Sequence, residues 1–201
     1  MAYYQHQNQI PKVTCLVSDH APEYNNISTQ HQSLCWVHDA RYYKKLEPRL
    51  KIHREKLDRF IKLYWEFYYQ LLNYKKAPSK ALVGELEHKF DTIFTTKTNY
   101  FQLDKLINRT FKNKEKLLTV LQKPQIPLHN NLAELGARRK VRKRDISYHT
   151  MSEKGTRCLD AFMTITQTAI QLNIDVFKYI KQMINQDKDR VTLAQLIIQK
   201  Y

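Results

Sequence analysis

Two acidic residues occupy positions where carboxylates can act as ligands or catalysts. Asp19 directly follows residues 12–18, a run of β-branched and apolar residues (KVTCLVS) that predicts a buried strand. In α/β sheets, polar ligand sites form at the carboxyl ends of strands. Glu134 lies at the end of the segment PLHNNLAE, near the start of a predicted helix. Taken alone, Asp19 also fits a turn or capping residue, and Glu134 fits a surface acid in a first helical turn.

Cys35 and His38 form a second pair that could do chemistry, because zinc sites use a spacing of three residues. No second pair completes a four-ligand site nearby. The sequence therefore favours packing of Cys35 and Trp36, with His38 at a strand end, over a metal site.

Basic residues are concentrated in residues 138–144 (RRKVRKR), where six of seven positions are cationic. These are Arg138, Arg139, Lys140, Arg142, Lys143 and Arg144. A solvated face would account for such a run, and phosphate contacts are the alternative. The first long predicted helix carries a second cationic surface, which comprises Lys44, Lys45, Arg49, Lys51, Arg54, Lys56 and Arg59. Its tyrosines are more typical of helix packing than of base stacking; they are Tyr42, Tyr43, Tyr64, Tyr68 and Tyr69.

The composition favours the phosphate interpretation of the basic run. The 201 residues include 34 Lys and Arg against 19 Asp and Glu, a formal net charge of +15. Such an excess indicates a polyanionic partner, with nucleic acid ahead of a membrane surface. No run approaches 18 apolar residues, so no membrane span is expected. Three cysteines without a C-x-x-C pair favour a reduced, cytoplasmic setting.

The elements that must position these residues are mostly helices. A second short strand is predicted at residues 33–37, beside the first. Apolar residues at three- and four-residue spacings then predict helices at 40–73, 79–96, 100–122, 153–173, 175–185 and 191–199, with a short helix through Glu134. Pro48 is placed to kink or divide the first of them. The expected fold class is α/β and predominantly helical, and two strands alone would be marginal in water.

Three segments together resemble the catalytic region of the insertion-sequence 66 type of DDE transposases. They are residues 16–24 (LVSDHAPEY), 34–46 (LCWVHDARYYKKL) and 127–180, which begins PLHNNLAELG. The C-W-x-H-x-x-R motif of the family falls on Cys35, Trp36, His38 and Arg41, and N-N-x-A-E falls on Asn130, Asn131, Ala133 and Glu134. Ser152 and Gly155 occupy a last Ser/Gly-bearing element before a helix.

The resemblance implies an RNase H-like core with a helical insertion at about residues 40–122. It makes Asp19 the second and Glu134 the third acid of a triad that binds two Mg²⁺ (or Mn²⁺) ions. Such ions lie about 3.5–4 Å apart and stabilise the attacking and leaving oxygens of phosphoryl transfer. The implied partners are the DNA of element ends and targets, and a second copy or a full-length transposase. The implied compartment is a prokaryotic cytoplasm.

Two positions depart from the family pattern. The first acid should lie upstream of Asp19, yet none of the 18 residues before Asp19 is acidic. The first three strands, that acid and the N-terminal DNA-binding region are therefore expected to be missing, and residues 1–201 to form a partial catalytic domain. His129 stands where the family usually has an acid.

Two hypotheses of function follow. The chain is either the C-terminal part of a transposase, inactive alone in DNA cleavage and strand transfer, or a non-enzymatic DNA-binding remnant that modulates a full-length enzyme. Charge alone would also suit a helical RNA-binding protein, but the order of the motifs speaks against it.

Overall fold

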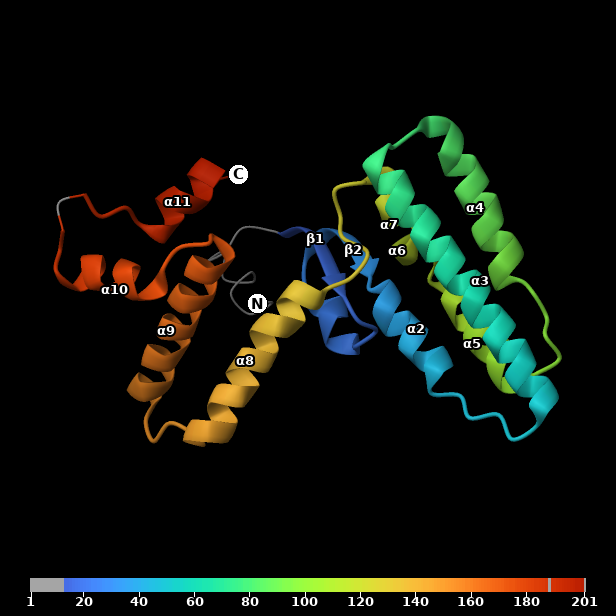
Figure 1. Ribbon diagram of the computed structural model, residues 1–201, viewed down its shortest axis with the longest axis horizontal. Helices are drawn as coiled ribbons and strands as arrows, with labels where there is room; N and C mark the ends of the chain where they lie inside the picture. The colour runs from blue at the N-terminus through green and yellow to red at the C-terminus, as the bar shows by residue number, and fades with distance from the viewer. Residues whose placement is uncertain (1–12, 188, 201) are drawn as a thin grey trace. The chain divides into compact units, whose positions relative to one another are not determined.

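The computed structural model describes residues 13–187 and 189–200, which form two compact units. The first unit comprises Met1–Asn130 and the second Asn131–Tyr201, and each is described here by itself (Figure 1). Lys12, at the start of the predicted first strand, lies outside the described residues. The described chain is mostly helical with two short strands, as the pattern of apolar residues predicted.

The two strands of the first unit pair in parallel. They are β1 (Val13–Ser18) and β2 (Thr29–Leu34), in a register that sets Cys15 opposite His31 and Ser18 opposite Leu34. The connection between them contains the 3₁₀ turn η1 (Pro22–Asn26), with Pro22 at its start, where a proline suits the first turn. The pairing confirms the prediction, but the predicted bounds of the second strand, 33–37, are wrong. β2 has the polar sequence TQHQSL, which gives no apolar strand signal.

The chain turns from strand to helix at Cys35. The Cys35 N–H donates to Ser18 O at 2.8 Å, and the Trp36 N–H donates to Leu128 O at 3.0 Å. Trp36 is then the first residue of α2 (Trp36–Lys44) and is fully buried. Residues 34–37 form the apolar run that predicted a strand. They are apolar because the helices that follow enclose this corner.

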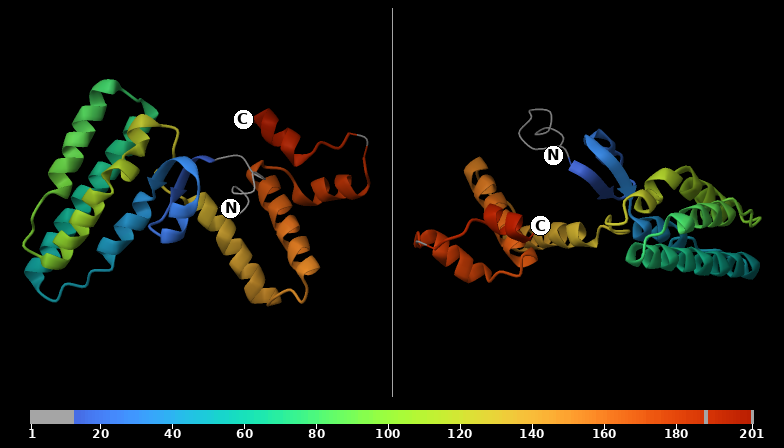
Figure 2. Two further views of the ribbon diagram at one scale, coloured as in Figure 1. Left: turned by 180° about the vertical axis from the view of Figure 1, so that it is seen from behind. Right: turned by 90° about the horizontal axis from the view of Figure 1, so that it is seen from above.

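Helices α3 (Lys51–Lys76), α4 (Lys80–Phe94) and α5 (Phe101–Lys112) lie side by side, as the views in Figures 1 and 2 agree. The predicted helix at 40–73 is in fact α2 and α3, divided around Pro48. The predicted helix at 100–122 is also divided, into α5, α6 (Lys114–Leu117) and α7 (Thr119–Gln122). The prediction for 79–96 is confirmed by α4.

Aromatic side chains form the core of the first unit. The Trp36 ring lies 5.4–6.3 Å, centroid to centroid, from four rings contributed by α3 and α4: Tyr64, Phe67, Phe90 and Phe94. The Trp36 indole N–H donates to Leu117 O at 3.0 Å, so its polar atom is satisfied as well. Three of the five tyrosines noted in the sequence are buried here, which supports the packing interpretation; they are Tyr43, Tyr64 and Tyr68.

The second unit consists of α8 (Asn131–Ser147), α9 (Glu153–Gln171), α10 (Val176–Ile184) and α11 (Leu193–Lys200). The prediction of a short helix through Glu134, separate from the basic run, is wrong, because α8 carries both. Ser152 caps α9 by accepting from the Gly155 N–H at 3.1 Å, and Asp175 caps α10 by accepting from the Lys178 N–H at 2.8 Å. Across residues 13–187 and 189–200, no helix is both long and apolar enough to cross a membrane.

Candidate functional site

Asp19 lies in the turn that follows β1. Its side chain is half-buried, and Oδ1 accepts a hydrogen bond from the Ala21 N–H at 3.0 Å. This bond fixes the turn that leads into η1, so Asp19 does act as a turn residue. The same bond holds the carboxylate at the carboxyl end of a strand in a parallel pair, the position that the sequence predicted for a ligand site.

A cavity of about 370 Å³ opens beside Asp19. Its lining combines the turn after β1 with one face of α2: Asp19, His20, Ala21, Pro22, His38, Arg41, Tyr42 and Lys45. His38, Arg41 and Lys45 are three and four residues apart, which places them on one side of the helix. Arg41 Nη1 lies 2.7 Å from His38 Nε2. Because a guanidinium only donates, His38 accepts this bond at Nε2.

Behind this cavity lies a buried acid that sequence reasoning overlooked. Asp39 is fully buried, and its Oδ2 accepts from Thr110 Oγ1 at 2.7 Å and from the Tyr64 hydroxyl at 3.2 Å. Its Oδ1 pairs with Arg109 Nη2 at 3.2 Å and lies 3.7 Å from His20 Nε2. The signal that could have found it is an acid on the inward face of α2, between the buried residues of that helix.

Asp39 fixes one wall of the cavity through its partners. The Arg109 guanidinium that it holds lies 3.4 Å above the centre of the Tyr42 ring. The Tyr42 ring in turn meets the His20 ring edge-on at 5.8 Å between centroids. His20 and Tyr42 are therefore held in place by an ion pair between α2 and α5.

The surroundings shift the titration of three groups near the cavity. Burial lowers the pKa of His20, and the neighbouring Arg109 cation lowers it further. His20 therefore favours its neutral form. Burial raises the pKa of the Tyr43 and Tyr64 hydroxyls, and the negative charge of Asp39 adds to both shifts. Both tyrosines consequently remain protonated as hydrogen-bond donors.

Glu134 lies in the first turn of α8. Its side chain is 20% exposed, and its Oε2 is 3.4 Å from Arg138 Nη2, one helical turn further on. An acid here is favoured by the positive end of the helix dipole. Because Glu134 belongs to the second unit and Asp19 to the first, their convergence stays a prediction.

All six cations of the basic run are exposed on α8. With about 3.6 residues per turn, they spread around more than half of the helix instead of forming one stripe. Lys140 pairs with Asp160 at 2.7 Å, and Arg139 donates to Gln167 Oε1 at 2.5 Å. Arg142 and Arg144 have no partner among the residues that the structure describes.

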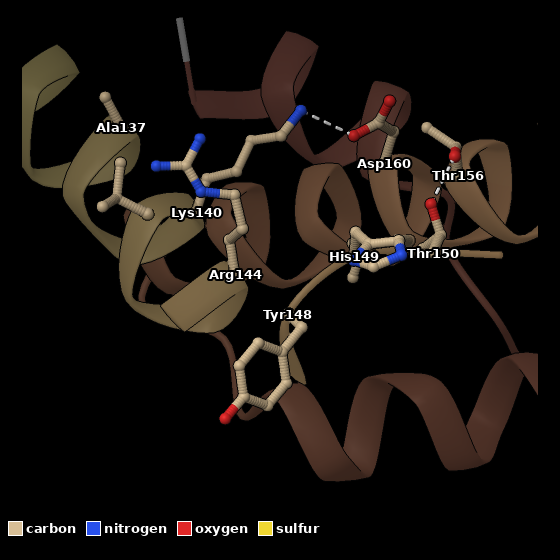
Figure 3. A pocket seen from close by; sticks show the side chains of 10 residues that line it. Ala137, Lys140, Arg144, Tyr148, His149, Thr150, Thr156 and Asp160 are labelled. Carbon is tan, nitrogen blue, oxygen red and sulfur yellow. Dashed lines mark hydrogen bonds and ion pairs between the residues drawn. The ribbon is translucent and has the colours of Figure 1, made fainter. Parts of the chain in front are cut away.

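A groove of about 590 Å³ runs between α8 and the start of α9 (Figure 3). Lys140, Arg144 and Tyr148 line it from the α8 side, and Asp160 and Thr156 from the α9 side. The Lys140–Asp160 ion pair crosses it, as Figure 3 shows. The basic helix is thereby anchored to α9 while most of its cations face solvent.

The second cationic surface spans more than the single helix predicted for it. Lys44 is the last residue of α2 and Lys45 caps its C-terminus, Arg49 lies in the connection, and the remaining members lie on α3. All of them are exposed except Lys56, which is half-buried.

The described residues do not by themselves fit a metal site. In the described part of the chain, no group of three or more His, Cys, Asp or Glu side chains could hold a metal ion. Each unit supplies one of the two predicted acids, and the neighbours of Asp19 in its cavity include Arg41 and Lys45. A two-ion site needs several carboxylates that converge on the ions, and no such group is present among the described residues. Cys35 is buried, and His38 bonds to Arg41, so this pair takes part in packing and hydrogen bonding.

The remaining motif residues lie at junctions between elements. Asn131 is the first residue of α8, and Asn130 occupies the position before it. Trp36 and Cys35 form the corner between β2 and α2. Both motifs therefore mark places where the chain passes from one element to the next.

The class of protein follows from comparison with known families. The pattern of the Transposase IS66 family matches residues 4–158, which extend from the N-terminal region into the start of α9. The chain belongs to this family of transposases, as the motifs predicted.

A curated relative from Sinorhizobium fredii (strain NBRC 101917 / NGR234), "Uncharacterized protein y4jO", is 33% identical over 188 residues. The alignment covers 93% of this chain and 58% of that relative. The chain thus spans less than two thirds of the length of the relative. No solved structure matches the chain.

Proposed function

We propose that this chain is the C-terminal part of the catalytic region of an IS66-type DDE transposase, with an incomplete RNase H-like core and the helical insertion at about residues 40–122. It contributes Asp19 as the second and Glu134 as the third acid to a site for DNA cleavage and strand transfer. The observation that carries the proposal is the place of Asp19, held by the Ala21 N–H at the carboxyl end of β1. Membership of the family supports the same assignment.

Divalent metal binding belongs to this proposal. Mg²⁺ or Mn²⁺, which take hard oxygen ligands, would bind Asp19 and Glu134 only together with the first acid of the triad. Since neither unit alone offers such a set, we assign no step to a metal and expect the chain to be inactive in cleavage by itself.

DNA is the proposed partner of the exposed basic run on α8. Lys and Arg neutralise phosphates and release counterions, which makes such binding strong at low salt and independent of sequence. A second function rests on the same surface: a DNA-binding protein without cleavage activity that modulates a full-length transposase, as a partner or by competing for DNA.

The experiment is an assay of the purified chain on a short labelled DNA duplex with Mg²⁺ or Mn²⁺. We expect salt-sensitive binding and no nicking. Addition of a full-length transposase of the family then separates the two functions. If cleavage rises with the chain but not with an Asp19→Asn variant, the chain supplies acids to the site. If both forms inhibit cleavage equally, the modulating function is supported. A chain that binds no DNA at low salt would contradict both.

A further inference from the structure

We propose that the Phe101 side chain, at one end of the helices of the first unit, inserts as a wedge between two base pairs of duplex DNA and bends the duplex. This end, the helix tip, comprises residues 49–54, around the start of α3, and residues 97–105, which lead into α5. The choice of DNA as the partner rests on the proposed function. The wedge requires neither that Asp19 and Glu134 meet nor that the chain cleaves DNA.

The two segments of the helix tip lie together. The His53 ring of α3 stacks on the Tyr100 ring, with 4.5 Å between the ring centroids and 10° between the ring planes. Figures 1 and 2 agree that the start of α3 and the loop between α4 and α5 lie at the end of the helices remote from the two strands. The helix tip is therefore one continuous surface built from two distant stretches of sequence.

Phe101 projects from the helix tip on a fixed base. It is the first residue of α5 and is 81% exposed, whereas the neighbouring Tyr100 is buried. The loop before it is held by Asp104, whose Oδ1 accepts from the Thr98 N–H at 2.8 Å and from the Thr98 hydroxyl at 2.6 Å. The Tyr100 hydroxyl donates to Gln102 Oε1 at 2.7 Å. Because this base is ordered before any partner arrives, binding through Phe101 costs little entropy.

Two further apolar side chains are exposed on the helix tip. Leu50 is 58% exposed and Ile52 is 57% exposed. A single exposed apolar residue is ordinary on a protein surface, whereas three on one tip indicate a surface that binds a partner.

The charge of the helix tip favours a polyanionic partner. Its only acid is Asp104, which is engaged by Thr98, and Glu47 and Glu55 flank it. Its cations are all exposed; they are Arg49, Lys51, Arg54, Lys97 and Lys105. A second copy of the chain would bring the same cations and a formal net charge of +15, so charge disfavours a second copy as the partner.

A wedge accounts for the apolar side chains and the cations together. Cations alone bind the outside of a duplex through its phosphates, which leaves apolar side chains in water. An inserted Phe, Leu or Ile unstacks a base step and kinks the duplex by about 20–90°, and contacts to the bent DNA offset the cost of unstacking. Pyrimidine–purine steps such as TA deform most easily, so we expect Phe101 to prefer them.

The test uses the full chain and a duplex of about 30 base pairs with one central TA step. The ends of the duplex carry a fluorescence energy-transfer pair, and a fluorescent purine analogue lies beside the TA step. A chelator is present, so that no cleavage takes place. We expect the chain to raise the energy transfer, because bending brings the ends together, and to raise the emission of the analogue, because unstacking relieves its quenching.

The key variant is Phe101→Ser, and the matched control is Tyr69→Ser, which changes an exposed ring of α3 outside the helix tip. Phe101→Ser should lose both signals and keep the salt dependence of DNA binding, because the cations remain. Phe101→Leu, which keeps an apolar wedge, should restore part of both signals. Tyr69→Ser should behave as the unmodified chain.

A second pair of variants tests the cations. In Lys51→Gln with Lys97→Gln, the slope of log affinity against log salt should fall by about 2, or roughly 0.9 for each lost phosphate contact. Lys62→Gln with Lys80→Gln removes two exposed cations outside the helix tip and should give a smaller change. Emission of Trp36 and Trp65 in urea checks that each variant remains folded.

Three outcomes would overturn the proposal. One is DNA binding by the unmodified chain without a change in either signal, and another is equal signals from Phe101→Ser and the unmodified chain. The third is a Phe101→Ser variant that changes the sedimentation of the chain and leaves both DNA signals intact, which would assign the helix tip to a protein partner. Failure of the proposed function is visible separately, as absence of stimulated cleavage while the bending signals persist.

Discussion

The carboxylate of Asp39 in α2 and the guanidinium of Arg109 in α5 form an ion pair of 3.2 Å across 70 residues of sequence. The Asp39 side chain is fully buried, whereas that of Arg109 is 30% exposed. Hydrogen bonds from Thr110 and Tyr64 complete the environment of the acid. The pair therefore joins the motif-bearing helix α2 to the helical insertion and fixes the wall of the cavity beside Asp19.

Replacing Asp39 should destabilise the first unit strongly. An Asp39→Ala variant leaves Arg109, Thr110 and Tyr64 without their shared acceptor, and breaking a buried pair in this way costs about 3–5 kcal/mol. The measurement is urea unfolding followed by tryptophan emission, because both tryptophans, Trp36 and Trp65, belong to the first unit.

The matched control is Glu153→Gln, which breaks the pair of Glu153 with Arg157, where both side chains are 79% exposed. Such surface pairs contribute about 0–1 kcal/mol, and this one lies in the other unit. If the free energy of unfolding of the Asp39→Ala variant lay within about 1 kcal/mol of that of the unmodified chain, the assigned role of Asp39 would be wrong.

Acidification should weaken the first unit through His20. Burial and Arg109 lower its pKa in the folded state below the usual value of about 6.5. The unfolded chain then binds more protons than the folded chain between the two pKa values, so stability falls as the pH drops below about 6.5. Asp39, Asp19 and His38 also face His20, and the two acids oppose the shift while His38 supports it.

The measurement compares urea midpoints at neutral and acidic pH for the unmodified chain and for His20→Gln. Removing the titrating ring should reduce the loss of stability on acidification. An equal loss in both proteins would assign the pH dependence to other groups. His53→Gln serves as control, because His53 stacks on Tyr100 away from this cluster and has no part in the argument.

The elements that the sequence predicted well are those whose signal is local. The helix at 79–96 and the three helices after residue 150 follow from apolar spacing, and the structure adds the caps Ser152 and Asp175 to two of them. The strand at 33–37 was misplaced because β2 is stabilised by pairing with β1, whereas its own residues are polar. Trp36 lies in an apolar run because it is buried against helices α3 and α4. No local sequence pattern reveals this tertiary contact.

The candidate site shows the same division. Asp19 and the basic run were found because an acid after a strand and a run of cations are readable in one short window. Asp39 was missed because its function as an acceptor depends on Tyr64, Arg109 and Thr110, which lie 25 to 71 residues away. The cavity needed the contact between the turn after β1 and α2, which spacing along the chain does not give.

Neutralising the basic helix should weaken DNA binding without unfolding it. Arg142 and Arg144 are exposed and have no partner in the described chain, so Arg142→Gln with Arg144→Gln removes no internal contact shown there. If both contact phosphates, the slope of log affinity against log salt should fall by about 2. Fluorescence anisotropy with a labelled duplex measures it, and Lys178→Gln with Lys181→Gln is a control of equal charge in the same unit.

The same measurement tests the role of metal ions. Binding by cations needs no metal, so a chelator should leave the affinity of the unmodified chain unchanged. Two results would refute the assignment of α8 as the DNA-binding helix. One is a loss of binding when the chelator is added. The other is an Arg142→Gln, Arg144→Gln variant that binds DNA as tightly as the Lys178→Gln, Lys181→Gln control.

Asp19 and Glu134 should approach each other when the two units assemble on DNA. Two acids that share metal ions must lie close together, because the ions themselves are only about 3.5–4 Å apart.

The variant for this test carries Asp19→Cys and Glu134→Cys in a Cys15→Ser, Cys158→Ser background, and leaves the buried Cys35 in place. A short thiol-specific cross-linker should join the two positions efficiently, and mass spectrometry of the digest identifies the linked peptides. The control replaces Glu134→Cys by Glu153→Cys, at the start of α9, which should give little product. Glu134 would be removed from the proposed triad if both cysteine pairs gave equal yields of cross-linked product, or if the pair at positions 19 and 134 gave none in the presence of DNA. Asp19 and its cavity would then remain as the functional part of the first unit.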